Sequence, residues 1–77
     1  MHLEIISPDK VIYTGNIESI TLPGKEGYFE ILNSHAPLIA LLKEGNIKYA
    51  ISKEDVRMLE ISQGFVEVNN NKVTVLV

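Results

Sequence analysis

Turn-forming residues interrupt this chain about every eight to ten residues, and this regular spacing limits the folds that the chain can adopt. Proline, glycine and asparagine occupy most of the interruptions, and these residues favour tight turns. The longest uninterrupted apolar run, at 38–42, has only five residues. No window of about a dozen residues carries the apolar stripe of an amphipathic helix. The segments between the turns are rich in β-branched and aromatic residues, which favours short strands.

We therefore predict an all-β domain, a flattened β-sandwich or barrel of roughly nine to ten short, mostly antiparallel strands. The strands are expected at residues 3–7, 11–14, 17–22, 28–32, 38–42, 47–52, 56–62, 65–68 and 72–77. A bulge is expected at Gln63-Gly64 and a tight turn at 69–71. A helix over 38–44, with Asn33 or Ser34 as its N-cap, is the competing interpretation of that segment. The residues expected to be mostly buried are Ile20, Leu22, Ile31, Leu59, Ile61, Phe65, Val66 and Val75.

The size and charge of the chain restrict its partners. Its 77 residues make a single domain, and 45% of them are hydrophobic, as expected of a globular protein. The net charge of −3 and the absence of a basic cluster argue against nucleic acid and anionic lipid as partners. The chain has no cysteine, no apolar run that could span a bilayer and no signal peptide. We expect a soluble cytoplasmic domain at 1–77 that does not insert into a membrane.

Residues that could carry catalysis or bind a cofactor are sparse. His35 is the only internal histidine, and no G-x-S-x-G elbow accompanies it, so a structural role in a loop is favoured. Gly24-Lys25 lacks the other residues of a phosphate-binding loop. Glu26 and Glu30 would lie about 13 Å apart along a strand, too far for a glycosidase pair. We predict no catalytic residue, no metal and no cofactor; these two acids are expected to be solvated or to contact another protein.

Several predicted strands have apolar residues on both faces. These are the strand with Ile5-Ile6 and the segments 11–13, 38–42 and 75–77. A sheet that buries one face needs only alternate apolar positions. One interpretation is that closure of the sandwich and its edges uses both faces. The other is that an outer face docks on a partner.

The central stretch from Glu26 to Leu38 ends in the sequence His35-Ala36-Pro37-Leu38. This stretch resembles the segment around the His-Ala-Pro-Leu signature of the epsilon subunit of F-type ATP synthases. The resemblance covers nearly the whole chain, through segments 3–8, 45–48, 61–68 and 72–76. It implies a β-sandwich that packs against the gamma subunit of the rotor. The resemblance therefore favours the interpretation that strands with apolar residues on both faces dock on a partner.

The resemblance implies a non-catalytic rotor subunit that joins the gamma subunit to the membrane c-ring and couples ion-driven rotation to ATP synthesis. Such a subunit would be peripheral, at the cytoplasmic face of the cell membrane. The alternative function is a free-standing β-sandwich module that binds a protein or a small ligand. By the resemblance, the c-ring would be contacted by Lys25, Glu26, Gly27, Tyr28, Phe29 and Glu30. The gamma subunit would be contacted by Ser7, His35, Ala36, Pro37, Leu38 and Ala40.

The chain departs from the family pattern in two places near the signature. Glu30 stands where many members have glycine, which affects the c-ring contacts, and Asn33 stands where many have proline, which affects the turn before His35. Many members also continue into a two-helix domain that restrains ATP hydrolysis and in some members binds ATP. The present sequence stops at Val77, so we expect this chain to couple rotation without inserting a helix and without binding ATP.

Overall fold

Nine β-strands make up most of the chain, and the computed structural model describes all residues from 1 to 77. The strands are β1 (His2–Ile6), β2 (Val11–Asn16), β3 (Ser19–Gly24), β4 (Gly27–Leu32), β5 (Leu38–Leu42), β6 (Gly45–Ser52), β7 (Asp55–Ile61), β8 (Gly64–Asn69) and β9 (Lys72–Leu76). The predicted all-β class and the predicted number of strands are therefore confirmed. The competing helix over 38–44 is wrong, because this segment forms β5 and pairs with β8.

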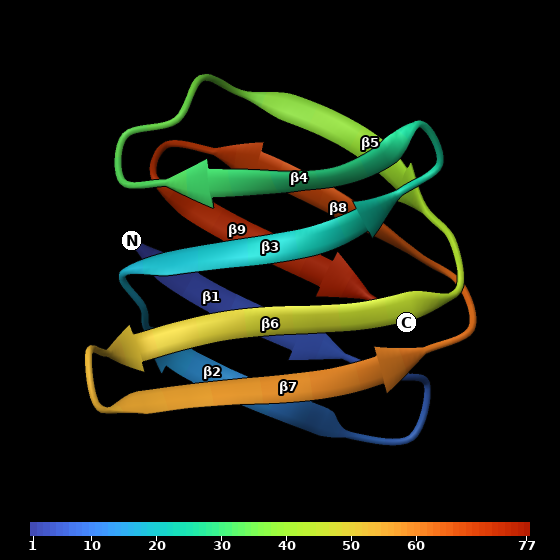
Figure 1. Cartoon of the computed structure of the whole chain (residues 1–77), viewed down its shortest axis with the longest axis horizontal. Coiled ribbons are helices and arrows are strands. Elements are labelled where there is room, and N and C mark those ends of the chain that lie inside the picture. Colours follow the sequence, from blue (N-terminus) through green and yellow to red (C-terminus); the bar gives the residue numbers. More distant parts are fainter.

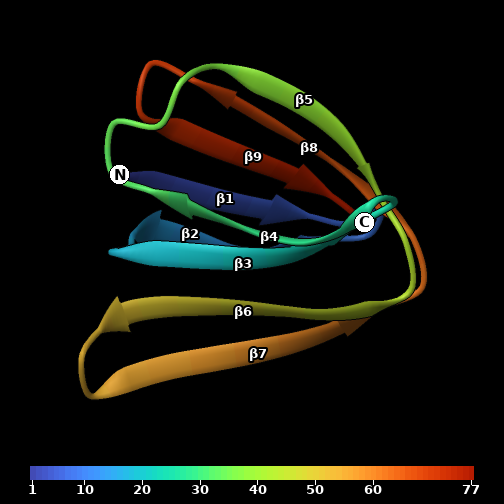
Figure 2. The ribbon, with the colours of Figure 1, turned by 45° about the horizontal axis from the view of Figure 1, so that its top comes forward.

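The strands form two layers that face each other (Figures 1 and 2). The hydrogen-bonded order is β2-β1-β9-β8-β5-β3-β6-β7, with β4 paired to β3. We term β2, β1, β9, β8 and β5 the first layer, and β4, β3, β6 and β7 the second layer. A single residue pair, Gly24 of β3 with Leu42 of β5, joins the two layers where the sheet folds over. Only β1 and β9 pair in parallel, so the sheet is mostly antiparallel, as predicted.

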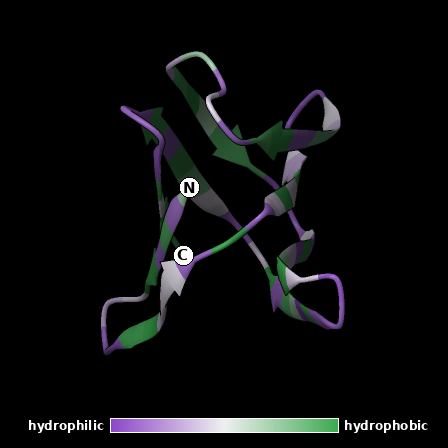
Figure 3. Cartoon of the chain, turned by 90° about the vertical axis from the view of Figure 1, so that its left-hand side faces the viewer, coloured by the Kyte–Doolittle hydropathy of each residue, from purple (hydrophilic) through white to green (hydrophobic).

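Alternate residues of both layers point into the space between the layers and form the core. In β1, for example, Leu3 and Ile5 are fully buried, whereas Glu4 between them is not. Burial of an aliphatic side chain stabilises the fold by about 1.5–3 kcal/mol. Figure 3 shows apolar residues along the strands of both layers. The fourteen buried apolar residues are Leu3, Ile5, Ile17, Ile20, Leu22, Ile31, Leu42, Ile47, Tyr49, Ile61, Val66, Val68, Val73 and Val75.

Contacts of the edge strand β2 with β6 and β7 link the two layers on the side away from the β3–β5 junction. The guanidinium of Arg57 lies 5.7 Å from the ring centre of Tyr13. The ring of Tyr13 packs against that of Tyr49, with 5.0 Å between their centres. Arg57 also donates to both carboxylate oxygens of Asp55 at 3.2 Å, and this hydrogen bonding raises the pKa of Arg57. An exposed cation over an aromatic ring contributes about 0.5–1 kcal/mol, so this cluster modestly stabilises the closure of the sandwich.

Leu59 and Phe65, both predicted to be mostly buried, are only half-buried. Leu59 packs against the core but lies on β7, an edge strand that pairs with β6 alone. Phe65 faces outward, because Val66 and Val68 occupy the core-facing positions of β8. The other six residues that we predict to be buried are buried.

The expected bulge at Gln63-Gly64 is wrong as well. Residues 62 and 63 form a bend, and Gly64 begins β8. The bend carries the chain from β7 in the second layer to β8 in the first, and these two strands do not pair with each other. The tight turn farther along is as predicted. Asn70 and Asn71 have φ angles of 51° and 59°, and Asn69 pairs with Lys72 around them, as in a two-residue hairpin turn.

The outward orientation of Phe65 can be tested by comparing it with its neighbour Val66. Val66→Ala removes buried methyl groups and should lower the free energy of unfolding by about 1–3 kcal/mol. Phe65→Ala should cost about 1 kcal/mol or less, although it removes more atoms. Urea unfolding of the two variants measures both costs. A loss of about 3–5 kcal/mol for Phe65→Ala, the range for a core phenylalanine, would place this ring in the core instead.

Candidate protein-interaction surface

The outer face of the first layer carries a row of apolar side chains, one from each of its strands. The register sets them side by side, because Phe65 lies opposite both Leu41 and Leu76. Leu76 also lies opposite Ile6, which in turn lies opposite Val11. Leu41, Leu76 and Val11 expose 56%, 46% and 53% of their surface, and Phe65 and Ile6 between them are half-buried. We term Leu41, Phe65, Leu76, Ile6 and Val11 the apolar row.

The apolar row arises from pairs of consecutive apolar residues in the sequence. Because side chains alternate along a strand, one member of each pair enters the core and the other faces outward. These pairs are Ile5-Ile6, Leu41-Leu42, Phe65-Val66 and Val75-Leu76. The sequence signal was therefore present, but it does not say which member faces outward. A contiguous exposed apolar surface marks a contact with another molecule, so the structure favours docking as the explanation of the two-faced strands.

Two shallow grooves extend the apolar row at the end of the first layer. One groove connects the row at Leu41 to Lys25. The other connects the row at Leu76 to Ser7. Exposed apolar surface therefore runs from a residue predicted to contact the c-ring to one predicted to contact the gamma subunit.

The residues predicted to contact the gamma subunit lie at two ends of the first layer. The exposed segment His35-Ala36-Pro37 belongs to the loop between β4 and β5. Ser7 directly follows β1, at the opposite end, where β5 finishes. Leu38 and Ala40 are half-buried and pack against the core, whereas their neighbours Ile39 and Leu41 point outward. A partner that reaches both ends would have to cover the outer face between them.

The residues predicted to contact the c-ring lie around the turn between β3 and β4. The tip of this turn, Lys25-Glu26, is exposed, and Tyr28 and Glu30 point outward from β4. Phe29 points the other way and packs against the core. Gly27, with a φ of 130°, starts the returning strand in a conformation that suits glycine. The set therefore presents a polar tip and an exposed edge, while Phe29 and Gly27 shape the turn.

Two backbone hydrogen bonds tie this polar tip to the first layer. The N–H of Lys25 donates to the carbonyl of Leu41 at 3.2 Å, and the N–H of Lys43 donates to the carbonyl of Pro23 at 2.8 Å. The polar tip and the apolar row are therefore parts of one hydrogen-bonded unit.

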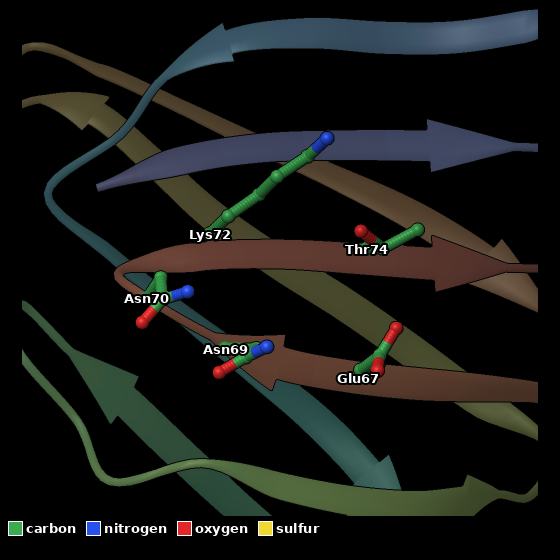
Figure 4. Close-up of a pocket in the computed structure, with 5 residues that line it drawn as sticks. All are labelled: Glu67, Asn69, Asn70, Lys72 and Thr74. Carbon is green, nitrogen blue, oxygen red and sulfur yellow. The ribbon is translucent and has the colours of Figure 1, made fainter.

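The structure holds no constellation typical of catalysis or metal binding. No charged side chain is buried, and no three histidine, cysteine or acidic residues gather as metal ligands would. No helix has the length and apolar character that crossing a membrane requires. A polar hollow of about 350 Å³ over β8 and β9 has no hydrophobic lining against which to bury a ligand. Figure 4 shows the residues that line this hollow, which are Glu67, Asn69, Asn70, Lys72 and Thr74.

Comparison with known proteins confirms the family resemblance. The family model for the ATP synthase, Delta/Epsilon chain, beta-sandwich domain, matches residues 1–77. The chain is 39% identical over 74 residues to the ATP synthase epsilon chain of Chlorobaculum tepidum, covering 96% of this chain and 84% of that one. It is 46% identical over 77 residues to the ATP synthase epsilon chain of Sulfurimonas denitrificans, covering 100% of this chain and 59% of that one. The chain thus spans most of some relatives and little more than half of others.

Two solved structures share the fold. The TM-score is 0.90 with a chain of the Euglena gracilis mitochondrial ATP synthase, at 23% identity, covering 97% of this chain and 48% of that one. It is 0.84 with a chain of the Tetrahymena thermophila mitochondrial ATP synthase central stalk and c-ring, at 22% identity, covering 99% and 61%. At these identities the likeness establishes the fold, while the family model and the curated relatives establish the kinship. The chain belongs to the ATP synthase delta/epsilon family, as the β-sandwich domain of this non-catalytic stalk subunit.

Proposed function

We propose that this domain is a rotor element of an F-type ATP synthase, which joins the gamma subunit to the c-ring so that ion-driven rotation is coupled to ATP synthesis. The observation that carries the proposal is the exposed apolar row, tied to the polar tip at Lys25-Glu26. The names of the relatives support it, since the Chlorobaculum and Sulfurimonas proteins are ATP synthase epsilon chains. The domain would lie peripherally at the cytoplasmic face of the cell membrane.

In this proposal the gamma subunit covers the outer face of the first layer. The apolar row forms the buried centre of the contact, where most of the binding energy of an interface arises. Glu67 and Thr74, which lie opposite each other on the same face, add polar contacts between the apolar row and the His35 end of the first layer. Ser7 and the segment His35-Ala36-Pro37 contact gamma at the two ends, and Leu38 and Ala40 support that segment from the core side.

The c-ring contacts the polar tip and the outward side chains of β4. Lys25, Glu26, Tyr28 and Glu30 suit the polar loops of that ring, and the turn keeps its shape through Gly27 and Phe29. Torque passes between the two partners through the backbone, because the tip is hydrogen-bonded to β5. A rigid clamp of this kind needs shape and buried area rather than reactive groups.

Leu41 offers a cleaner test of the gamma contact than Ala40 does. Ala40→Arg would put a charge on the run predicted to face gamma, but the side chain of Ala40 packs against the core. That variant should therefore lower the stability of the isolated domain as well as its binding. Leu41 exposes 56% of its surface, so a charge at this position leaves the core intact.

Leu41→Arg should weaken binding to the purified gamma subunit by about 3 kcal/mol, because the charge would be unpaired in a buried interface. Met58→Arg is the matched control, since Met58 is 63% exposed on the second layer and lies outside the proposed contact. This control should bind like wild type, and neither variant should change the unfolding midpoint. Calorimetric titration with gamma measures the binding. Wild-type affinity of Leu41→Arg would remove gamma from this face, whereas a wild-type domain that does not bind gamma would favour the free-standing module.

Glu26→Lys and Glu30→Lys should have smaller effects, below about 1 kcal/mol each, because exposed rim charges contribute little. The effects should appear with the purified c-ring, fade at high salt and be absent with gamma. A pull-down against each partner at two salt concentrations measures them. If either variant weakens gamma binding as much as Leu41→Arg does, the division into a gamma side and a c-ring side is wrong.

A further inference from the structure

The loop between β4 and β5 has no hydrophobic anchor, since residues 33–37 are all exposed. Apart from its bonds to distant residues, the loop makes hydrogen bonds only between residues close together in the sequence. The N–H of His35 donates to the carbonyl of Leu32 at 3.2 Å, and Nδ1 of His35 lies 2.8 Å from the carbonyl oxygen of Ala36. Ser34 has a φ of 64°, in the left-handed region that is uncommon for serine. Burial and local bonding do not account for the shape of this loop.

Asn71 supplies an anchor from a distant part of the sequence. The N–H of Ser34 donates to Oδ1 of Asn71 at 2.8 Å, across 37 residues. Nδ2 of Asn71 in turn donates to Oδ1 of Asn33 at 3.0 Å. The backbone carbonyl of Asn71 accepts a hydrogen bond from the N–H of His2 at 3.1 Å. One residue therefore connects the loop, the β8–β9 turn and the start of β1.

The backbone of the β8–β9 turn selects the kind of residue that can make these bonds. Asn70 and Asn71 both have positive φ, which matches a type I′ hairpin turn. Asparagine tolerates this conformation better than most residues with a side chain. Its amide also donates and accepts, as the two bonds to the loop require. Glycine would complete the turn equally well but could not hold the loop.

We propose that Asn71 is a positioning residue for partner docking. Its hydrogen bonds to Asn33 and Ser34 hold the segment His35-Ala36-Pro37 in the shape that the gamma subunit binds. This inference rests on the proposed function, which assigns that segment to the gamma contact. Without the two bonds the loop samples other shapes. The partner then binds only the fraction of molecules with the right loop, so the measured association constant falls to that fraction of its full value.

Asn71→Gly removes both bonds without harming the turn, because Asn-Gly is a favoured sequence for a type I′ hairpin. Its binding to purified gamma should be about tenfold weaker than that of wild type, since the loop is no longer held. Its unfolding midpoint should not fall. Asn70→Gly is the matched control, because Asn70 has the same backbone conformation and its side chain makes no hydrogen bond to the loop. This control should bind within about twofold of wild type.

Aspartate variants distinguish the effect of losing the hydrogen bonds on gamma binding from the effect of changing side-chain size. Asn71→Asp keeps an acceptor for the N–H of Ser34, and the amide of Asn33 can turn to donate to the other carboxylate oxygen. Asn33→Asp likewise keeps an acceptor for the amide of Asn71. Each single variant should bind gamma nearly as wild type does. The double variant opposes two carboxylates and should bind about tenfold more weakly. Single effects that simply add up to the double effect would contradict the proposed pairing.

Amide hydrogen exchange at Ser34, followed by NMR in the free chain, links the binding data to the loop. This amide should be protected in wild type and in Asn70→Gly, and unprotected in Asn71→Gly. If Asn71→Gly frees the amide but binds gamma as tightly as wild type, the positioning role is wrong and the proposed function stands. If wild type itself does not bind gamma, the proposed function fails, and the positioning role fails with it.

Discussion

The alternation of side chains along a β-strand is the constraint on which the rest of this structure depends. Strands of the first layer carry two apolar residues in succession, and the pleat sends one into the core and the other outward. Cross-strand pairing then aligns the outward members into the apolar row. A slip of one residue would exchange core and surface, so the register that builds the core also builds the candidate docking face.

The small size of the domain explains why apolar packing stabilises its core while hydrogen bonds position its loops. A chain of 77 residues buries a modest core, and its loops have little apolar material to pack beneath them. Hydrogen bonds therefore help to hold the two loops of interest, and Phe29 packs against the core beside the first of them. The turn at Lys25-Glu26 is tied to β5 through the backbone, and the loop before His35 is tied to the β8–β9 turn through Asn71. Both are thus fixed relative to the same sheet, as the proposed role of a clamp between gamma and the c-ring requires.

Local features of the sequence were sufficient to predict the strands, because glycine, proline and asparagine end strands through their own backbone preferences. Features that depend on contacts between distant parts of the sequence could not be predicted in this way. The orientation of Phe65 depends on its pairing with Leu41 and Leu76, from strands that sequence analysis could not place beside it. The bonds between Asn71 and the loop join residues 37 and 38 positions apart. The family resemblance named the segment around His35 but not the apolar row, which becomes visible only once the register is known.

The central claim is that the gamma subunit covers the outer face of the first layer, and thiol labelling tests it most directly. The chain contains no cysteine, so single cysteines can be introduced at exposed positions without background. Leu41→Cys and Leu76→Cys report on the apolar row, and Met58→Cys reports on the second layer. Maleimide labelling is measured before and after gamma is added. The account predicts that gamma protects the first two thiols and leaves the third reactive. Protection of Met58→Cys with continued labelling of Leu41→Cys and Leu76→Cys would contradict it.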